Sequence, residues 1–311
     1  HRTPPPTPGT PRARQQIVHP VRNPMRAPVP KKPVRSLITA ADPTQVVILR
    51  EEQKPTNDSD AVFYFPGCGS ERLFSQIGLA TLAMLYKAGA KTVLPPGYLC
   101  CGYPQASNGD HNKGHAISTA NRVLFHRIAN TLNYLDIKTV IVSCGTCMDQ
   151  LLKYEFEKIF PGCRLLDIHE YLMEKNITVT NTADTRYLYH DPCHTPMKTY
   201  NPVKVASSLM QQQVQLSDRC CGESGTLGTA RPDIADQLRY RKQEELQQGL
   251  VKLTGQPNNI QNQVKLLTSC PACQQGLSRY SDDTGLETDY IVVELCKQLL
   301  GDNWESEFLQ K

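Results

Sequence analysis

The sequence predicts an α/β protein of two pseudo-repeated modules, each a mostly parallel sheet flanked by helices, with cysteine sites at the carboxyl ends of the strands. Three observations lead to this prediction. A lone cysteine, an adjacent cysteine pair followed by glycine, and a C-x-x-C occur in the same order twice in 311 residues. Each cysteine group follows a short apolar run typical of a strand. Segments with helical periodicity separate these runs, and such alternation indicates a parallel sheet.

The first copy of the pattern begins with the apolar run Ala61–Phe65, which predicts a strand, and Cys68 follows it closely. A helical pattern with apolar residues on one face comes next, and Gly89 suits its carboxyl-terminal cap. The adjacent pair and the C-x-x-C then follow two further predicted strands. The other elements expected in this copy are strands at 91–94 and 139–142 and helices at 113–133 and 146–156.

The second copy repeats this order. Its first predicted strand, Tyr187–His190, is followed by Asp191, Pro192 and Cys193, and Pro271 suits the first turn of a helix after Cys270. Because the carboxyl ends of parallel strands meet at one edge of a sheet, each copy is expected to gather its five thiols there. The other elements expected in this copy are strands at 214–216 and 264–268, a helix at 232–247 and a polar loop at 255–263.

Composition divides the chain into three parts. Residues 1–60 hold more than half of the 23 prolines and much of the formal net charge of +4, so they predict a disordered, Pro-rich, basic linker. The first cysteine-rich module is placed at 61–185 and the second at 186–311. The chain begins with histidine rather than methionine, which leads us to expect further domains upstream.

The same composition excludes several classes of protein. No run of 18 apolar residues exists, so no transmembrane segment is expected, and no signal peptide is recognisable. The basic linker is interpreted as a spacer, and no nucleic-acid partner is expected. Clustered cysteines in a chain with ample helix and strand indicate metal ligands or redox centres in a reducing compartment. We therefore predict a cytoplasmic protein, either free or peripheral at the inner face of the membrane.

Ten cysteines are candidate metal ligands. Thiolates bind soft metals, and five thiols per module exceed the four ligands of a structural zinc site. The adjacent pair suits a cluster with several irons, since its two side chains diverge. Spacing alone thus favours an iron–sulfur cluster, and leaves zinc and a redox dithiol or vicinal disulfide as alternatives. The ten are Cys68, Cys100, Cys101, Cys144, Cys147, Cys193, Cys220, Cys221, Cys270 and Cys273.

Three residues beside the cysteines are candidates for a supporting role. His190 and His194 flank Cys193 and could donate hydrogen bonds to a cluster sulfur or move protons; a structural role is the alternative. Glu223 could relay protons, or it could be an exposed loop carboxylate. No catalytic residue is identified. The two cysteines outside the pattern are expected to be buried small hydrophobic residues; they are Cys163 and Cys296.

Six short strings resemble the cysteine-rich "CCG" domain family, which includes the B subunit of heterodisulfide reductase, iron–sulfur subunits of glycolate oxidase and anaerobic glycerol-3-phosphate dehydrogenase, and a lactate utilisation protein. The resemblance covers roughly residues 61–300. The strings are Pro66-Gly67-Cys68, Cys100-Cys101-Gly102-x-Pro104, Ser143-Cys144-x-x-Cys147, His190-Asp191-Pro192-Cys193-His194, Cys220-Cys221-Gly222-Glu223-Ser224-Gly225 and Ser269-Cys270-Pro271-x-Cys273.

This resemblance implies an iron–sulfur electron-transfer module with one noncubane [4Fe–4S] cluster per five-cysteine set. It also implies an FAD-linked 2-hydroxyacid dehydrogenase of the lactate or glycolate type as donor, with FAD on an upstream domain or a partner. A ferredoxin-type module between them and a quinone or other acceptor are further implied partners. The alternatives are a thiol–disulfide reductase of the heterodisulfide type and a zinc-stabilised interaction module.

Overall fold

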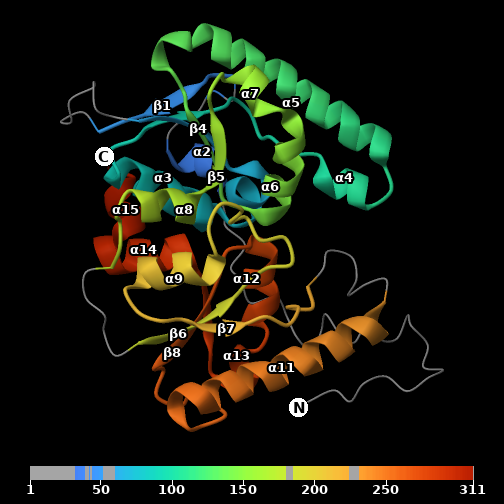
Figure 1. Ribbon diagram of the computed structural model, residues 1–311, viewed down its shortest axis with the longest axis vertical. Helices are drawn as coiled ribbons and strands as arrows, with labels where there is room; N and C mark the ends of the chain where they lie inside the picture. The colour runs from blue at the N-terminus through green and yellow to red at the C-terminus, as the bar shows by residue number, and fades with distance from the viewer. Residues whose placement is uncertain are drawn as a thin grey trace. The chain divides into compact units, whose positions relative to one another are not determined.

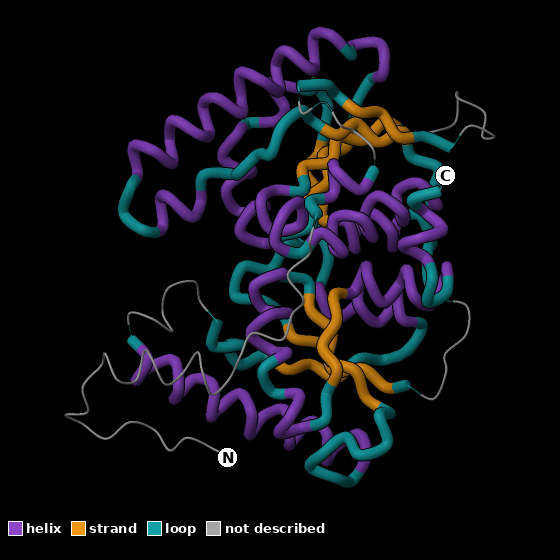
Figure 2. Tube along the Cα trace, turned by 180° about the vertical axis from the view of Figure 1, so that it is seen from behind, coloured by secondary structure: helices purple, strands orange, loops and turns teal. Residues whose placement is uncertain are grey.

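A computed structural model describes residues 32–38, 42, 44–51, 60–179, 185–223 and 231–310. The contacts divide the chain into two compact units, each with one sheet (Figure 2). The first unit contains the first cysteine pattern, and the second unit contains the second. The first consists of Val29–Asn181, His194–Gln211 and Ile291–Lys311, and the second includes Thr182–Cys193 and Gln212–Tyr290.

The sheet of the first unit has five strands in the order β1-β3-β2-β4-β5. β1 pairs antiparallel with β3, and the other neighbours are parallel. β2 has the sequence AVFYF and is buried on both faces, as expected for a central parallel strand. The strands are β1 (Val47–Leu49), β2 (Ala61–Phe65), β3 (Lys91–Leu94), β4 (Thr139–Val142) and β5 (Arg164–Asp167).

The sheet of the second unit has four strands, all parallel, in the order β7-β6-β8-β9. This order matches β3-β2-β4-β5 of the first unit strand for strand, so the predicted pseudo-repeat and the predicted α/β class are confirmed. The strands are β6 (Arg186–His190), β7 (Gln215–Ser217), β8 (Val264–Thr268) and β9 (Glu287–Tyr290).

Helices cover both faces of the first sheet (Figure 1). On one face α5, α6 and α7 enclose an aromatic core, in which the rings of Phe63 and Phe125 meet edge to face at 5.0 Å. α3 and α8 lie on the other face. The helices named here are α3 (Ser75–Lys87), α4 (Tyr103–Ser107), α5 (His111–Thr131), α6 (Gly145–Leu151), α7 (Phe156–Ile159) and α8 (Ile168–Glu174), and short turns follow at η1 (Gly69–Leu73), η2 (Asn133–Leu135) and η3 (Leu152–Tyr154).

Three helices from the second half of the sequence belong to the first unit: α9 (Pro202–Met210), α14 (Ile291–Leu300) and α15 (Trp304–Phe308). α14 packs against α3, where the Cys296 thiol donates to the Ala80 carbonyl at 3.5 Å. The compact units are therefore not contiguous in sequence. The modules at 61–185 and 186–311 stay a prediction about the extent of the sequence repeat.

Two segments within residues 1–60 are ordered, so the predicted disordered linker is wrong for them. β1 extends the first sheet, and α2 (Val34–Leu37) packs beside α3 with Val34 buried. The Arg35 amide donates to Glu71 Oε1 at 3.0 Å, and its Nε donates to the Gly97 carbonyl at 3.1 Å. Apolar burial and these bonds offset the ordering entropy that the composition suggested could not be met. Residues 1–31 and 52–59 lie outside the described residues.

The second unit carries α11 (Pro232–Thr254), α12 (Pro271–Ser278) and α13 (Ser281–Thr284). α11 extends beyond the predicted 232–247 and ends at Gly255, whose φ is 77°. In the first unit the helix predicted at 146–156 is interrupted, because Glu155 has a φ of 54° and caps α7. Among the described residues no helix combines the length and the apolar character needed to cross a bilayer.

Candidate metal centres

The first cysteine site forms where three neighbouring parallel strands end. Cys68 follows β2, Cys100 and Cys101 follow β3, and Cys144 and Cys147 follow β4. Cys144 caps the amino end of α6, and Cys147 lies in its first turn. Because the order of these strands is β3-β2-β4, the loops that carry all five thiols leave the same edge of the sheet.

The five thiols of this site form a connected chain of contacts. Hydrogen bonds join Cys68 to Cys100, Cys100 to Cys101, Cys101 to Cys147, and Cys147 to Cys144. The structure thus brings all five predicted residues together, although their role as metal ligands stays a prediction.

The thiols of the first site compete for protons. Hydrogen bonds from Cys101 and Cys68 lower the pKa of Cys100 to about 2, and a hydrogen bond from Cys147 lowers the pKa of Cys144 to about 6. The pKa of Cys68 is raised, first by its hydrogen bond to Cys100 and then by burial. Five adjacent thiols cannot all ionise without a cation to neutralise them, and metal binding would supply that cation.

Glycine leaves the space that the first site needs. A Cβ on Gly67, whose φ is 65°, would lie 2.7 Å from the sulfur of Cys147. A Cβ on Gly102, whose φ is 90°, would lie 2.7 Å from the carbonyl oxygen of Gly114 in α5. These two glycines therefore let the cysteine loops approach one another and the helix.

Buried polar groups hold the backbone of the cysteine pair. The Tyr154 hydroxyl donates to the Cys101 carbonyl at 2.9 Å, and Asn121 Nδ2 donates to the Cys100 carbonyl at 2.7 Å. Asn121 Nδ2 also lies 3.0 Å from the Tyr154 hydroxyl. The loop thus has its carbonyl groups satisfied from below, and its thiols remain directed to the site.

The second cysteine site repeats this arrangement in the second unit. Cys193 follows β6, the pair Cys220 and Cys221 follows β7, and Cys270 and Cys273 follow β8. The sulfurs of Cys221 and Cys273 are 3.4 Å apart. Hydrogen bonds join Cys220 to Cys221 and Cys273 to Cys270.

Cys193 is the least integrated of the five. It is exposed, and it is linked to the others through an electrostatic effect that contributes to the raised pKa of Cys220, whose largest cause is the hydrogen bond from Cys221. The structure therefore gathers four thiols of the second set closely and places the fifth at the rim.

The backbone of the second pair is held as in the first. The Tyr280 hydroxyl donates to the Cys221 carbonyl at 3.2 Å, as Tyr154 does for Cys101. Gly222 has a φ of 78°, and a Cβ there would lie 2.9 Å from Cγ of Arg239 in α11. The supporting geometry is thus part of the repeat.

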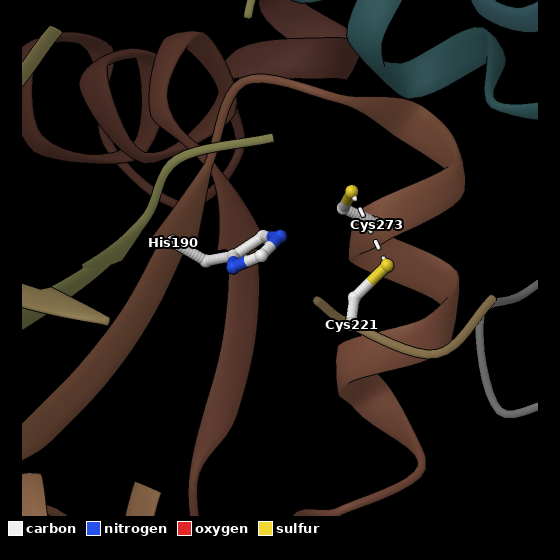
Figure 3. Close-up of side chains that lie close together, drawn as sticks. All are labelled: His190, Cys221 and Cys273. Carbon is white, nitrogen blue, oxygen red and sulfur yellow. Dashed lines mark hydrogen bonds between the residues drawn. The ribbon is translucent and has the colours of Figure 1, made fainter. Parts of the chain in front are cut away.

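His190, predicted as a supporting residue, lies at the second site. It is the last residue of β6 and is buried. One of its nitrogens and the sulfurs of Cys221 and Cys273 all lie within 4.8 Å of one another, and Figure 3 shows the edge of the ring directed toward them. Its Nδ1 lies 3.1 Å from the carbonyl oxygen of Ser217 and 3.2 Å from Nζ of Lys242.

Glu223 also lies close to the second site, but it is not the exposed loop carboxylate considered as an alternative. Its Oε1 accepts from Arg279 at 3.1 Å and from Gln275 at 3.2 Å, and Arg239 lies 3.9 Å from Oε2. Burial raises its pKa, and Arg279 and Arg239 oppose that effect. These contacts tie the loop after Cys221 to α11 and α12.

His194 is placed differently from the expectation. Although it follows Cys193, its side chain contacts residues of the first unit: Nδ1 lies 2.5 Å from Asp149 and Nε2 lies 3.2 Å from the Tyr103 hydroxyl. The segment that begins at His194 packs over α6, where a Cβ on Gly145 would lie 1.5 Å from the His194 carbonyl oxygen. His194 therefore serves the surroundings of the first cysteine site.

The two cysteines outside the pattern lie away from both sites. Cys296 is fully buried in α14, as predicted. Cys163 is only partly buried and packs against the core of the first unit, where burial raises its pKa to about 11.

The sequence analysis missed several residues of the sites. Tyr154 and Tyr280 follow Cys147 and Cys273 at equal spacing, so a comparison of the two copies could have found them. Lys242 gives no such signal, because a lysine within the charged stretch of α11 is typical of an exposed helix face. It is in fact fully buried, and Nζ donates to Ser217 Oγ and to Glu245, both at 2.7 Å.

Comparison with known families supports the repeat. The family model of the cysteine-rich domain (CCG) matches residues 62–152 and again residues 187–278, so both copies of the pattern are covered. Residues 278–311 match a domain of unknown function, DUF3400.

Similar proteins include several iron–sulfur proteins. An uncharacterized iron-sulfur protein of Methanococcus maripaludis is 25% identical over 253 residues, which are 78% of this chain and 47% of that protein. A fumarate reductase (CoM/CoB) subunit of Methanothermobacter marburgensis is 26% identical over 240 residues, 74% and 44% respectively. The probable glycolate oxidase iron-sulfur subunit of Bacillus subtilis is 24% identical over 258 residues, 77% and 54% respectively. The chain thus spans about half the length of these relatives.

Proposed function

Because the chain belongs to the cysteine-rich CCG-domain family, we propose that it is an iron–sulfur electron-transfer module of an oxidoreductase. The observation that carries this proposal is the connected set of five thiols at one sheet edge, formed in the first unit and nearly repeated in the second. The names of its relatives, which include a probable glycolate oxidase iron-sulfur subunit and lactate utilization proteins, support the same role.

The donor set fits iron better than zinc. A structural zinc would use four ligands and leave a buried thiol without a metal. Bound iron–sulfur clusters, one per site and of the noncubane [4Fe–4S] type by family resemblance, would carry single electrons. The proposed ligands of the first site are Cys68, Cys100, Cys101, Cys144 and Cys147, and those of the second are Cys193, Cys220, Cys221, Cys270 and Cys273.

The protein's own residues prepare both sites. Tyr154 and Tyr280 fix the carbonyl groups of the cysteine pairs, so the pairs present their sulfurs without rearrangement. Burial of Cys101, Cys147, Cys221 and Cys273 excludes water from the inner side of each site. A dry, fixed thiolate shell limits reorganisation when an electron arrives.

The proposed donor is an FAD-linked 2-hydroxyacid dehydrogenase of the lactate or glycolate type, on an upstream domain or a partner. A ferredoxin-type module is proposed between the two, and a quinone or another oxidant is the proposed acceptor. The names of the glycolate oxidase and lactate utilization relatives favour this donor. The proposed location is the cytoplasm or the inner face of the membrane.

A second candidate is reduction of a disulfide, and one observation favours it. A pocket of about 430 Å³ reaches Cys220 and is lined by Arg219 and Arg241, which would attract an anionic substrate. Each disulfide would take two electrons and two protons and yield two thiols, with the electrons supplied by the same dehydrogenase.

The test is an electron-transfer assay with protein purified without oxygen. Photoreduced flavin serves as donor, and a water-soluble quinone serves as acceptor. The proposal predicts that flavin bleaches the visible iron–sulfur absorption and that quinone restores it. Thiol release from a disulfide in place of quinone reduction would favour the second candidate. Protein that contains iron but accepts no electrons from flavin would contradict both.

A further inference from the structure

From the surroundings of the second cysteine site we infer that His190, oriented by Lys242, donates an N–H from Nε2 to the sulfurs of that site and raises its reduction potential above that of the first site. This inference rests on the proposed function and deepens it. It assigns a positioning role to Lys242 and an order to the two sites in the path of the electron.

The position of the proton on His190 follows from its neighbours. Nδ1 lies 3.2 Å from Nζ of Lys242, and an ammonium group can only donate. An N–H at Nδ1 would oppose the hydrogens of that ammonium, so Nδ1 accepts. The carbonyl oxygen of Ser217, 3.1 Å from Nδ1, instead accepts from the same ammonium at 3.2 Å. The proton of the neutral imidazole is therefore on Nε2.

Nε2 has no hydrogen-bond partner among the residues that the structure describes, and it is buried. Because Nδ1 faces Ser217 and Lys242, the nitrogen on the sulfur side is Nε2, which places it within 4.8 Å of the sulfurs of Cys221 and Cys273 (Figure 3). A buried N–H without a partner is costly, and an anionic sulfur site beside it would satisfy it.

Lys242 is held in its charged form. Its Nζ donates to Glu245 Oε2 at 2.7 Å. Glu245 is itself fixed by the amides of Asp218 and Arg219, at 2.9 and 3.2 Å, directly before the second cysteine pair. Burial lowers the pKa of Lys242, and the carboxylate of Glu245 opposes that effect. The lysine is thus a fixed donor and not a flexible surface side chain.

The first site lacks this device. The last residue of β2, in the register position of His190, is Phe65, which lies edge to face with Phe125 at 5.9 Å. If Gly114 of α5 and Ala235 of α11 are matched, since each approaches the glycine after a cysteine pair, Lys242 corresponds to Asn121. Both hydrogen bonds recorded from Asn121 Nδ2 go to the Cys100 carbonyl and Tyr154.

Hydrogen bonds to cluster sulfurs stabilise the reduced, more negative state and so raise the reduction potential. An electron that enters the protein would therefore reside preferentially at the second site. The first site is then the entry side, and the second is the site from which the acceptor is reduced.

The test is a reductive titration of the anaerobically purified protein, followed by optical and paramagnetic resonance spectra. His190→Phe, which copies the first site, should lower the higher of two midpoint potentials by about tenfold in equilibrium constant, or 59 mV for one electron. The lower potential should not move. His190→Gln retains an N–H donor and should preserve most of the higher potential. Phe65→Leu, at the matching position of the first site, should leave it unchanged.

The role of Lys242 is tested by Lys242→Met combined with Glu245→Gln, so that no carboxylate is left unpaired. This double variant should lower the higher potential as His190→Phe does. Unchanged potentials in His190→Phe or in the double variant, with full iron, would overturn the inference and leave the proposed function intact.

A second readout separates a hydrogen bond from direct ligation. In protein labelled with ¹⁵N-histidine, pulsed resonance of the reduced second site should show a weak nitrogen coupling that disappears in His190→Phe. A strong coupling, or loss of that site's iron in both His190→Phe and His190→Gln, would make His190 a ligand and overturn the inference. Absence of iron from the unmutated protein would contradict the proposed function itself, and this inference with it.

Discussion

The two cysteine sites share their framework and differ in their charge. In both, a tyrosine of the central strand meets the serine before the C-x-x-C: Tyr64 and Ser143 at 2.9 Å in the first, Tyr189 and Ser269 at 3.1 Å in the second. In both, a second tyrosine holds the carbonyl of the cysteine pair. What repeats is therefore the scaffold that converges five thiols on one edge.

The differences lie one layer behind the sulfurs. The first site is backed by phenylalanine rings and an asparagine, whereas the second is backed by His190 and the fully buried Lys242. A buried ammonium needs a carboxylate partner and costs stability if it is lost. The comparison teaches that a duplicated scaffold can keep its geometry while its electrostatics diverge, which is what two sites in series require.

The largest effect is expected from removing one ligand in each site. Cys101→Ser should lose the iron of the first site and Cys221→Ser that of the second, because a hydroxyl is a poor ligand for iron compared with a thiolate. Iron and sulfide analysis of each variant measures this. Cys163→Ser, outside both sites, is the control and should keep all its iron. Full iron in both site variants would mean that the second cysteine of each pair is dispensable.

Gly67→Ala should damage the first site and spare the second, where Pro192 holds the corresponding place. Its Cβ would meet the Cys147 sulfur at 2.7 Å, at a φ that favours glycine. We expect a loss of about 2 to 4 kcal/mol in the free energy of unfolding, together with iron from one site. Gly109→Ala is the matched control, since its φ is 91° but no atom lies within 4 Å of the added Cβ. Equal losses in the two variants would show that backbone strain alone acts.

The two supporting tyrosines should differ in strength. Tyr154→Phe leaves a carbonyl and an asparagine amide without their hydroxyl partner and should cost about 1 to 3 kcal/mol. Tyr280→Phe removes a longer bond and should cost about 0.5 to 1.5 kcal/mol. Urea denaturation of both variants gives the comparison. A larger loss for Tyr280→Phe would reverse the order of support proposed here.

The smallest effect is expected from acid. Burial alone would raise the pKa of Glu245, but Lys242 and neighbouring amides lower it to about 2 from an ordinary 4.5. A carboxyl whose folded pKa is lowered stabilises the protein above its unfolded pKa, and that contribution is lost as the pH falls from about 4.5 toward 2. Glu245→Gln should therefore flatten the fall in urea midpoint between pH 6 and pH 4. Asp233→Asn, in an exposed ion pair with Arg231, should change that slope less.

Much of this could be predicted from the sequence. The strands that end at cysteines were found because their apolar runs are short and bounded, and the parallel sheet followed from their alternation with helices. Every parallel strand before a cysteine group is present, with ends within one residue of the prediction. The gathering of the cysteines could be predicted because only sheet topology decides it.

The rest depends on contacts that local patterns do not encode. The strand β1 and the helix α2 lie in a Pro-rich, basic stretch, and only burial against the first unit stabilises them. His194 follows a cysteine of the second site yet contacts Tyr103 and Asp149, because the chain passes from one unit to the other at that point. Lys242 was missed because tertiary packing, and not its neighbours in sequence, buries it.

The central claim is that each five-cysteine set is an iron–sulfur site, and metal analysis tests it most directly. Protein purified without oxygen should be brown and should contain iron and acid-labile sulfide in comparable amounts, with iron divided between the two sites by the Cys101→Ser and Cys221→Ser variants. Stoichiometric zinc in a colourless protein that contains neither iron nor sulfide would contradict the account.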